Sequence, residues 1–306
     1  MNELLLKAKE FLDDFVLDFG VLREKLTEIG KLYLKLNNCD LQLEVSFDKS
    51  MLFGKSGSVF ENYISFNKTR IETLFEMKID CNDDCHLHNI YEFYNMYNKK
   101  EEHSICEQCL YEFMQKYISL GCERYFDKMG SYKMIKYELL DTILHENQHI
   151  VQRRHKEYLA SVDECPLDDK NLLLFFTMLF NEVYSTLKKA KVDFDYVREN
   201  YIFPIGFDAR YEAMIILDKL REKYFKLDND FETYLCESNI IPKDFDIEKT
   251  ANQLFDDYLR IYEIYRCKIE SGFEDANKYV LQNKNSIVAE IMKRYKKMVS
   301  IGNKKE

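Results

Sequence analysis

The chain has 306 residues, which is enough for one large domain or two modest ones. With only nine Gly and three Pro it has too few turn residues for a β-sandwich or barrel, so we expect a mainly α (α+β) protein. Its net charge of -10 argues against a nucleic-acid partner, because a phosphate backbone is bound by a basic surface.

The first part of the chain should combine helices with a small β element. Residues 2–37 carry apolar side chains at three- and four-residue steps, which predicts one or two amphipathic helices ending at Asn37-Asn38. Leu41–Phe47 alternates apolar and polar residues and is a predicted strand, and Asn62–Asn67 is a second one. Phe53–Val59, with two Gly, is a predicted turn.

The rest of the chain should be helical apart from loops near Pro166 and Pro204 and over residues 226–244. Helices are expected over residues 68–78, 110–128, 132–160, 172–191, 207–225 and 247–299, the last divided near Gly272. This predicts three regions: an N-terminal α+β region (1–130), a helical core (131–225) and a C-terminal helical region packed on that core (226–306).

No segment predicts contact with a membrane. The most apolar stretch, Leu172–Phe180, is too short to cross a hydrocarbon core of ~30 Å. The first residues lack a basic segment followed by an apolar run, so no signal peptide is expected and the cytoplasm is the predicted location. The nine Cys are then expected as thiols or metal ligands rather than as disulfides.

The motif that carries chemistry is His-Glu-Asn-Gln-His at residues 145–149. At about 100° per residue, His145 and His149 are neighbours on one helical face, where their imidazoles can share a zinc ion. Glu146 stands beside them and can act as a general base on a water molecule. The apolar residues around the motif favour a helix that is buried on one side.

Together with Gln152, this stretch resembles the H-E-x-x-H-x-x-Q type of gluzincin-like zinc metallopeptidases. In that family a later Pro-x-Glu-x-Asp-Ala-Arg segment begins the helix that supplies an acidic third ligand, and here the segment reads Pro204-Ile-Gly-Phe-Asp-Ala-Arg210. The resemblance covers residues 132–220 and implies a zincin-like helical core. Gly206 replaces the family's Glu, so Asp208 is the predicted third ligand, with Glu212 one turn later as a ligand or an outer partner.

Two other residues are alternatives for the third ligand. His155 gives a spacing similar to that of metzincins, but on an unbroken helix it lies about 120° round and ~9 Å along from His149. Glu182 follows the apolar stretch in an Asn-Glu pair similar to one found in some gluzincins.

A second metal site is predicted within residues 81–109. Cys81, Cys85, Cys106 and Cys109 form two closely spaced pairs of soft ligands, which suits a structural zinc ion, although buried free thiols are the alternative. The basic residues Lys293, Arg294, Lys296 and Lys297 suit the negative end of a terminal helix and need no partner.

We therefore expect a zinc-dependent hydrolase of peptide bonds that takes a peptide or protein substrate. Peptidases of this type lay their substrate along the edge of a sheet, which Leu41–Phe47 or Asn62–Asn67 could supply. The alternatives are a binding or regulatory protein that keeps a zincin scaffold without turnover, and an interaction domain in which only the Cys cluster binds zinc.

Overall fold

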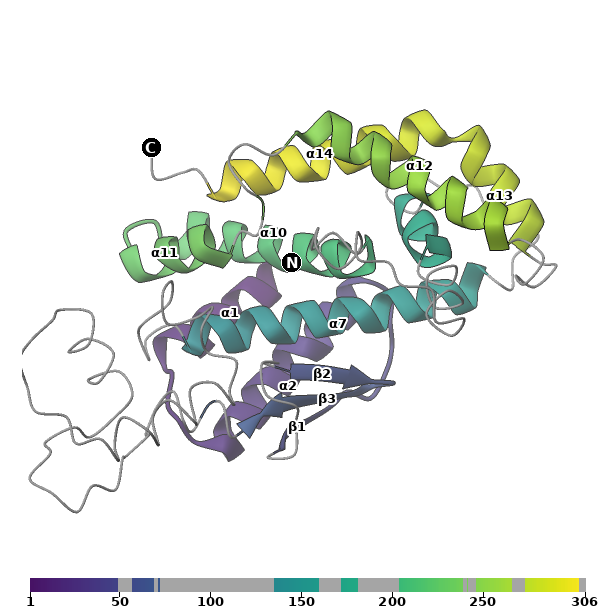
Figure 1. Cartoon of the computed structure of the whole chain (residues 1–306). Helices are drawn as coiled ribbons and strands as arrows, with labels where there is room; N and C mark the ends of the chain where they lie inside the picture. Colours follow the sequence, from purple (N-terminus) through teal and green to yellow (C-terminus); the bar gives the residue numbers. More distant parts are fainter. Residues whose placement is uncertain are drawn as a thin grey trace, which may run out of the picture. The chain divides into compact units, whose positions relative to one another are not determined.

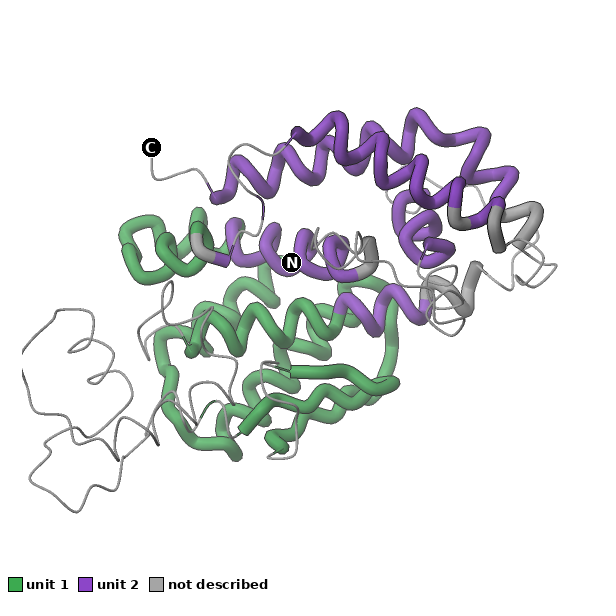
Figure 2. The backbone as a smooth tube through the Cα atoms, viewed as in Figure 1, with its two compact units in different colours: residues 1–147, 219–237 green, residues 148–218, 238–306 purple. Residues whose placement is uncertain are grey.

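A computed structural model describes residues 1–48, 57–68, 71, 135–159, 172–180, 204–238, 241, 246–265 and 273–302. These residues are mainly helical and include one three-stranded sheet, as predicted (Figure 1). They form two compact units, coloured in Figure 2, one from residues 1–147 and 219–237 and the other from residues 148–218 and 238–306. The division falls inside two continuous helices, α7 (Ile135–Leu159) and α10 (Pro204–Tyr224).

The N-terminal helices of the first unit confirm the prediction for residues 2–37. They are α1 (Asn2–Asp13) and α2 (Phe19–Leu36), which pack their apolar faces together. Asp18 caps α2, since its carboxylate accepts from the backbone N–H groups of Gly20 and Val21 at 2.8 and 3.0 Å. Beyond the C-terminal end of α2, Asn38 adopts φ 56° and turns the chain away.

The sheet has the strand order β1-β3-β2, from β1 (Glu44–Asp48), β2 (Gly57–Phe60) and β3 (Tyr63–Asn67). β3 pairs in parallel with β1 and antiparallel with β2. The hairpin between β2 and β3 closes over two residues, and Glu61 takes φ 52° there. β3 is the buried central strand, with Ile64 and Phe66 fully covered.

Two strand predictions need correction. The prediction that Asn62–Asn67 could supply a free sheet edge is wrong, because β3 is paired on both sides. Residues 57–59, predicted as part of a turn, instead lie in β2, since their pairing with β3 overrides the turn propensity of Gly57 and Ser58. The edge strands of the described sheet are β1 and β2.

Two glycines let other elements approach α7 closely within the first unit. A Cβ built on Gly30 of α2 would lie 2.3 Å from Leu43 Cδ2 and 2.8 Å from Asn147 Nδ2. A Cβ built on Gly57 of β2 would lie 2.7 Å from Thr142 Cγ2 and 3.9 Å from the Glu146 side chain. The predicted motif helix therefore has α2 and the start of β2 directly against its first half.

The first half of α7 is also tied to α11 (Asn229–Ser238) by hydroxyl–carboxylate hydrogen bonds. Tyr137 donates to Asp228 at 2.8 Å, and Tyr234 donates to the buried Asp141 at 2.5 Å. Asp228 also caps α11 by accepting from the N–H of Phe231 at 3.0 Å.

The described residues of the second unit are almost all helical. It contains the second half of α7, a helix over residues 172–180, the first part of α10, α12 (Ile247–Tyr265), α13 (Phe273–Gln282) and α14 (Lys284–Gly302). α12 and α14 lie side by side (Figure 1). Its core is rich in ring contacts, such as Phe176 stacked on Phe255 at 5.5 Å and Phe207 tilted against Tyr295 at 4.4 Å.

The helix predictions for the second half of the chain are mostly confirmed, with three corrections. α10 begins at Pro204, where a loop was expected, because Pro suits the first position of a helix. Residues 226–244 were expected as loop but contain α11, which the Asp228 cap starts. Residues 273–302 form two helices separated at Asn283, without a Gly or Pro to mark the break.

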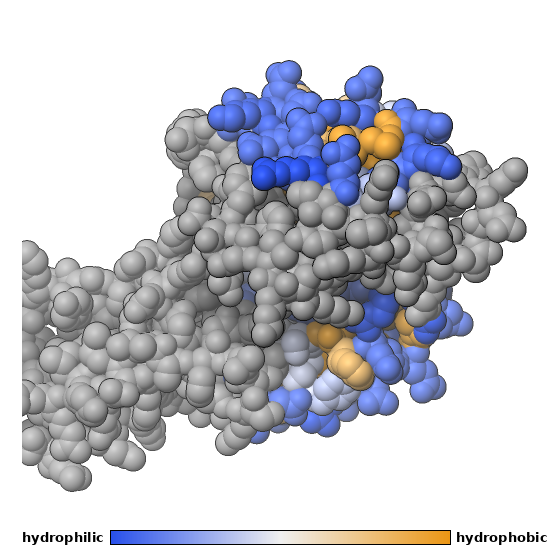
Figure 3. All heavy atoms as spheres, turned by 45° about the vertical axis from the view of Figure 1, so that its right-hand side comes forward, coloured by the Kyte–Doolittle hydropathy of each residue, from blue (hydrophilic) through white to orange (hydrophobic). Residues whose placement is uncertain are grey.

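No helix among the described residues is both long and apolar enough to cross a membrane. On the face drawn in Figure 3, hydrophilic side chains cover most of the described surface, and hydrophobic ones form small patches.

Candidate metal centre

The His-Glu-x-x-His motif lies within the regular helix α7, as predicted. His145, Glu146 and His149 are each half-buried, between buried apolar neighbours such as Leu144 and Ile150. The helical spacing puts the two imidazoles one turn apart on the same face. This is the arrangement that a two-His metal site on a helix requires.

The imidazole of His149 is oriented by Gln152, one turn further along α7. Its Nδ1 lies 2.7 Å from the side-chain carbonyl Oε1 of Gln152. A carbonyl oxygen only accepts, so Nδ1 carries the proton and Nε2 carries the lone pair. Burial, the largest cause, lowers the pKa of His149 below its ordinary value of 6.5, which favours the neutral ring.

Gln152 is in turn fixed by Asp208 of α10. The Gln152 Nε2 amide donates to Oδ2 of Asp208 at 2.7 Å, and the Gln148 amide donates to the same oxygen at 2.9 Å. All three side chains are at most 3% exposed. Two amides one turn apart on α7 thus converge on one carboxylate oxygen.

The other oxygen of Asp208, Oδ1, forms an ion pair with Arg294 of α14. Arg294 is only 1% exposed and lies 4.6 Å over the ring of Tyr211. Two more carboxylates stand near its guanidinium, Glu290 at 3.4 Å and Glu212 at 3.6 Å. A buried guanidinium needs such partners, because its desolvation is costly.

A neutral, oriented imidazole is the state in which His binds a metal ion, and ligating His side chains are held by a hydrogen bond at their other nitrogen. His149 meets both conditions. His145 offers a second imidazole one turn away on the same helix.

The structure does not complete a ligand set from the predicted residues that it describes. Among these residues, no three His, Cys, Asp or Glu side chains form a group that could hold a metal ion. Asp208 lies with Gln148, Gln152 and Arg294, and Glu212 lies with Arg294.

Several predicted ligands lie outside the described residues. They are Glu182, the four residues Cys81, Cys85, Cys106 and Cys109, and the side chain of His155, whose backbone belongs to α7. The second metal site predicted for residues 81–109 stays a prediction.

The sequence reasoning missed Gln148 and Arg294. Gln148 and Gln152 are spaced by four residues on α7, a polar pair at helical spacing that can signal a shared buried partner. Arg294 was expected as part of a basic helix end that needs no partner, which is wrong, because Arg294 is buried and pairs with Asp208. Its neighbour Lys293 does face solvent, with its side chain 71% exposed.

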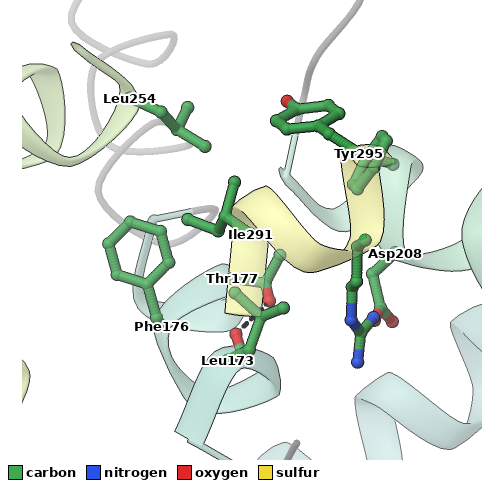
Figure 4. A pocket seen from close by; sticks show the side chains of 9 residues that line it. Leu173, Phe176, Thr177, Asp208, Leu254, Ile291 and Tyr295 are labelled. Carbon is green, nitrogen blue, oxygen red and sulfur yellow. Dashed lines mark hydrogen bonds and ion pairs between the residues drawn. The ribbon is translucent and has the colours of Figure 1, made fainter. Parts of the chain in front are cut away.

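A small cavity lies beside the Asp208–Arg294 pair. Figure 4 shows Leu173, Phe176 and Thr177 of the 172–180 helix lining it together with Asp208, Ile291 and Tyr295. Its volume is about 20 Å³, which has room for about one water molecule. It is therefore too small to bind a substrate.

The chain matches no protein-family model, no curated protein and no solved structure.

Proposed function

We propose that the chain is a zinc-dependent hydrolase of peptide bonds, with His145 and His149 as metal ligands and Glu146 as general base. The observation that carries this proposal is the hydrogen bond between His149 and Gln152 on α7, which leaves Nε2 of a neutral imidazole as the ligating atom. This contact supports the proposal because a ligating His is commonly held through its other ring nitrogen, and His145 stands one turn away on the same helix.

The chemistry expected of the bound zinc ion is to make its water acidic near neutral pH and to polarise the scissile carbonyl. Glu146 accepts the proton of the attacking water and passes it to the nitrogen of the leaving amine. It is half-buried, next to one ligand in sequence, and its side chain lies against the start of β2.

The substrate fits best along β2. This strand is an edge of the described sheet, and its first residue, Gly57, lies beside Thr142 and Glu146. An extended peptide that pairs with an edge strand gains backbone hydrogen bonds without regard to its sequence. Of the two edge strands, β2 is the one we assign, because its contact with Glu146 brings a bound peptide toward the proposed base.

The third ligand is proposed among Asp208, Glu212, Glu182 and His155. Both oxygens of Asp208 are engaged by two amides and a guanidinium, which counts against direct ligation by this carboxylate. Glu212 lies 3.6 Å from Arg294.

The second candidate function is a binding or regulatory protein that keeps the scaffold without turnover. One observation favours it: Gly206 stands where the resembling family has Glu.

The test is elemental analysis of the purified wild-type chain and of the double variant His145→Ala/His149→Ala. We expect the double variant to lose one zinc per chain. A wild-type ratio near two supports a zinc-binding Cys cluster as well. A double variant with the zinc content of the wild type refutes the proposed site, and a ratio near zero in both refutes every zinc assignment.

Glu146→Gln separates the two candidate functions. It preserves the shape of the side chain and removes the base, so a hydrolase keeps its zinc and loses about 10²–10⁴-fold in the cleavage rate of a fluorogenic peptide library. Zinc binding without cleavage by the wild type, over a broad set of peptides, supports the binding protein instead.

A further inference from the structure

A continuous line of buried polar contacts leads from α14 through α10 to the second His of the motif. Arg294 pairs with Oδ1 of Asp208, Oδ2 of Asp208 accepts from Gln152, and Oε1 of Gln152 faces Nδ1 of His149 at 2.7 Å. Every member of this line belongs to the same compact unit.

The direction of each hydrogen bond follows from the charged end. Arg294 can only donate, so Oδ1 of Asp208 accepts from it. Oδ2 of Asp208 accepts from the Gln152 amide, so Gln152 turns its NH₂ group toward Asp208 and its carbonyl toward His149. The carbonyl then requires a proton on Nδ1, which leaves the lone pair on Nε2. Arg294 thus sets the tautomer of His149 through Asp208 and Gln152.

We infer that Arg294 and Asp208 are positioning residues of the metal centre, which hold His149 through Gln152 in the tautomer that ligates. This inference rests on the proposed function. It assigns Asp208 to the outer support of a ligand rather than to the ion itself, because the carboxylate is already shared by Arg294, Gln148 and Gln152.

The experiment replaces Asp208 by Asn and measures zinc affinity by competition with a chromophoric chelator. An amide at position 208 can turn its own NH₂ toward Gln152. The Gln152 amide can then flip, so that its carbonyl faces position 208 and its NH₂ faces Nδ1 of His149, which leaves Nδ1 without an acceptor. Loss of such an outer partner lowers metal affinity by about 10–100-fold, and we expect Asp208→Asn to fall in that range.

Asp218→Asn is the matched control. Asp218 is also a buried carboxylate of α10 that pairs with α14, through Lys297 at 3.1 Å, whereas Asp208 is the carboxylate that accepts from Gln148 and Gln152 of α7. It therefore tests a generic loss of α10–α14 pairing. We expect it to keep the zinc affinity of the wild type, and equal losses in the two variants overturn the inference.

A second readout needs no metal. Labelling the six His rings with ¹⁵N and assigning His149 from a His149→Ala spectrum identifies which ring nitrogen carries the proton. We expect Nδ1–H in the metal-free wild type and in Asp218→Asn, and a shift toward Nε2–H in Asp208→Asn. Nε2–H in the wild type overturns the inference.

The two readouts separate failure of the inference from failure of the proposed function. If the wild type binds no zinc, the proposed function fails, and the ring-nitrogen result alone decides whether Asp208 sets the tautomer. If zinc binds tightly and Asp208→Asn changes neither readout, the function stands and the inference fails.

Arg294 needs a paired design, because its removal leaves Asp208 buried without its counter-charge. Arg294→Met alone can unfold the chain, whereas Arg294→Met/Asp208→Asn removes both charges together. We expect the folded double variant to show the same loss of zinc affinity as Asp208→Asn. Wild-type affinity in the double variant contradicts the role of the pair.

Discussion

Replacing Gly30 by Ala tests whether close packing of α2 holds the motif helix. Gly30 is buried in the interior of α2, where Ala is favoured over Gly by about 1 kcal/mol on helix propensity alone. Propensity therefore predicts a stabilised protein, and the packing described above predicts the opposite.

The packing cost follows from two short distances. A Cβ at position 30 would lie 2.3 Å from Leu43 Cδ2 and 2.8 Å from Asn147 Nδ2, both far inside normal contact. Leu43 is 4% exposed and Asn147 is fully buried, so neither can move into solvent. Forcing a methyl group into a packed core costs about 1–3 kcal/mol. After the gain in propensity of about 1 kcal/mol, we expect a net loss of up to about 2 kcal/mol.

The assay is urea unfolding followed by circular dichroism, with Gly20→Ala as the control. Gly20 lies in the first turn of the same helix and is exposed, and its Cβ would meet only Asp18 Oδ1, at 3.1 Å. We expect Gly20→Ala to be neutral or slightly stabilising. A Gly30→Ala protein as stable as Gly20→Ala would refute the close contact between α2 and α7.

Three further predictions concern stability. Hydrogen bonds, first from Ser65 and then from Ser46 and Tyr63, lower the pKa of Asp48 below its ordinary value of 3.8. The ionised Asp48 therefore stabilises the fold above pH 3.8, and this stabilisation is lost as the pH falls toward the lowered pKa. Asp48→Asn should flatten the pH dependence of the urea midpoint measured between pH 6 and pH 3. Phe176→Ala, at a fully buried ring that already borders a small cavity, should cost about 3–5 kcal/mol in urea unfolding, and a loss under 1 kcal/mol would contradict the packing. Tyr137→Phe removes only the hydroxyl that donates to Asp228 and should cost about 1–2 kcal/mol; no loss would mean that solvent replaces this bond.

Periodicity predicted the long helices well, because α2, α7 and α10 each bury a face whose apolar residues recur at helical spacing. Periodicity failed where a helix cap or a strand pairing decides the local structure. The Asp228 cap starts α11 inside a polar stretch that was expected as loop, and strand pairing turns residues 57–60 into β2 despite their turn-like composition.

The motif of the candidate site could be predicted because its two His and Glu are local to one helix. The buried contacts that hold His149 could not be predicted, because the residues that make them are distant in sequence. Gln152 and Asp208 are 56 residues apart, and Asp208 and Arg294 are 86 residues apart. Arg294 stands among other basic residues, and nothing local distinguishes it from Lys293 at the surface.

The amide of Gln152 has a consequence for the basicity of His149. A carboxylate placed directly on an imidazole N–H raises the electron donation of the other nitrogen, because it stabilises positive charge on the ring. Here the charge of Asp208 stands one side chain further away, and a neutral carbonyl makes the contact. His149 therefore donates less strongly than it would beside a carboxylate, so under the proposed function a metal ion at Nε2 would keep more of its Lewis acidity for water and for a carbonyl.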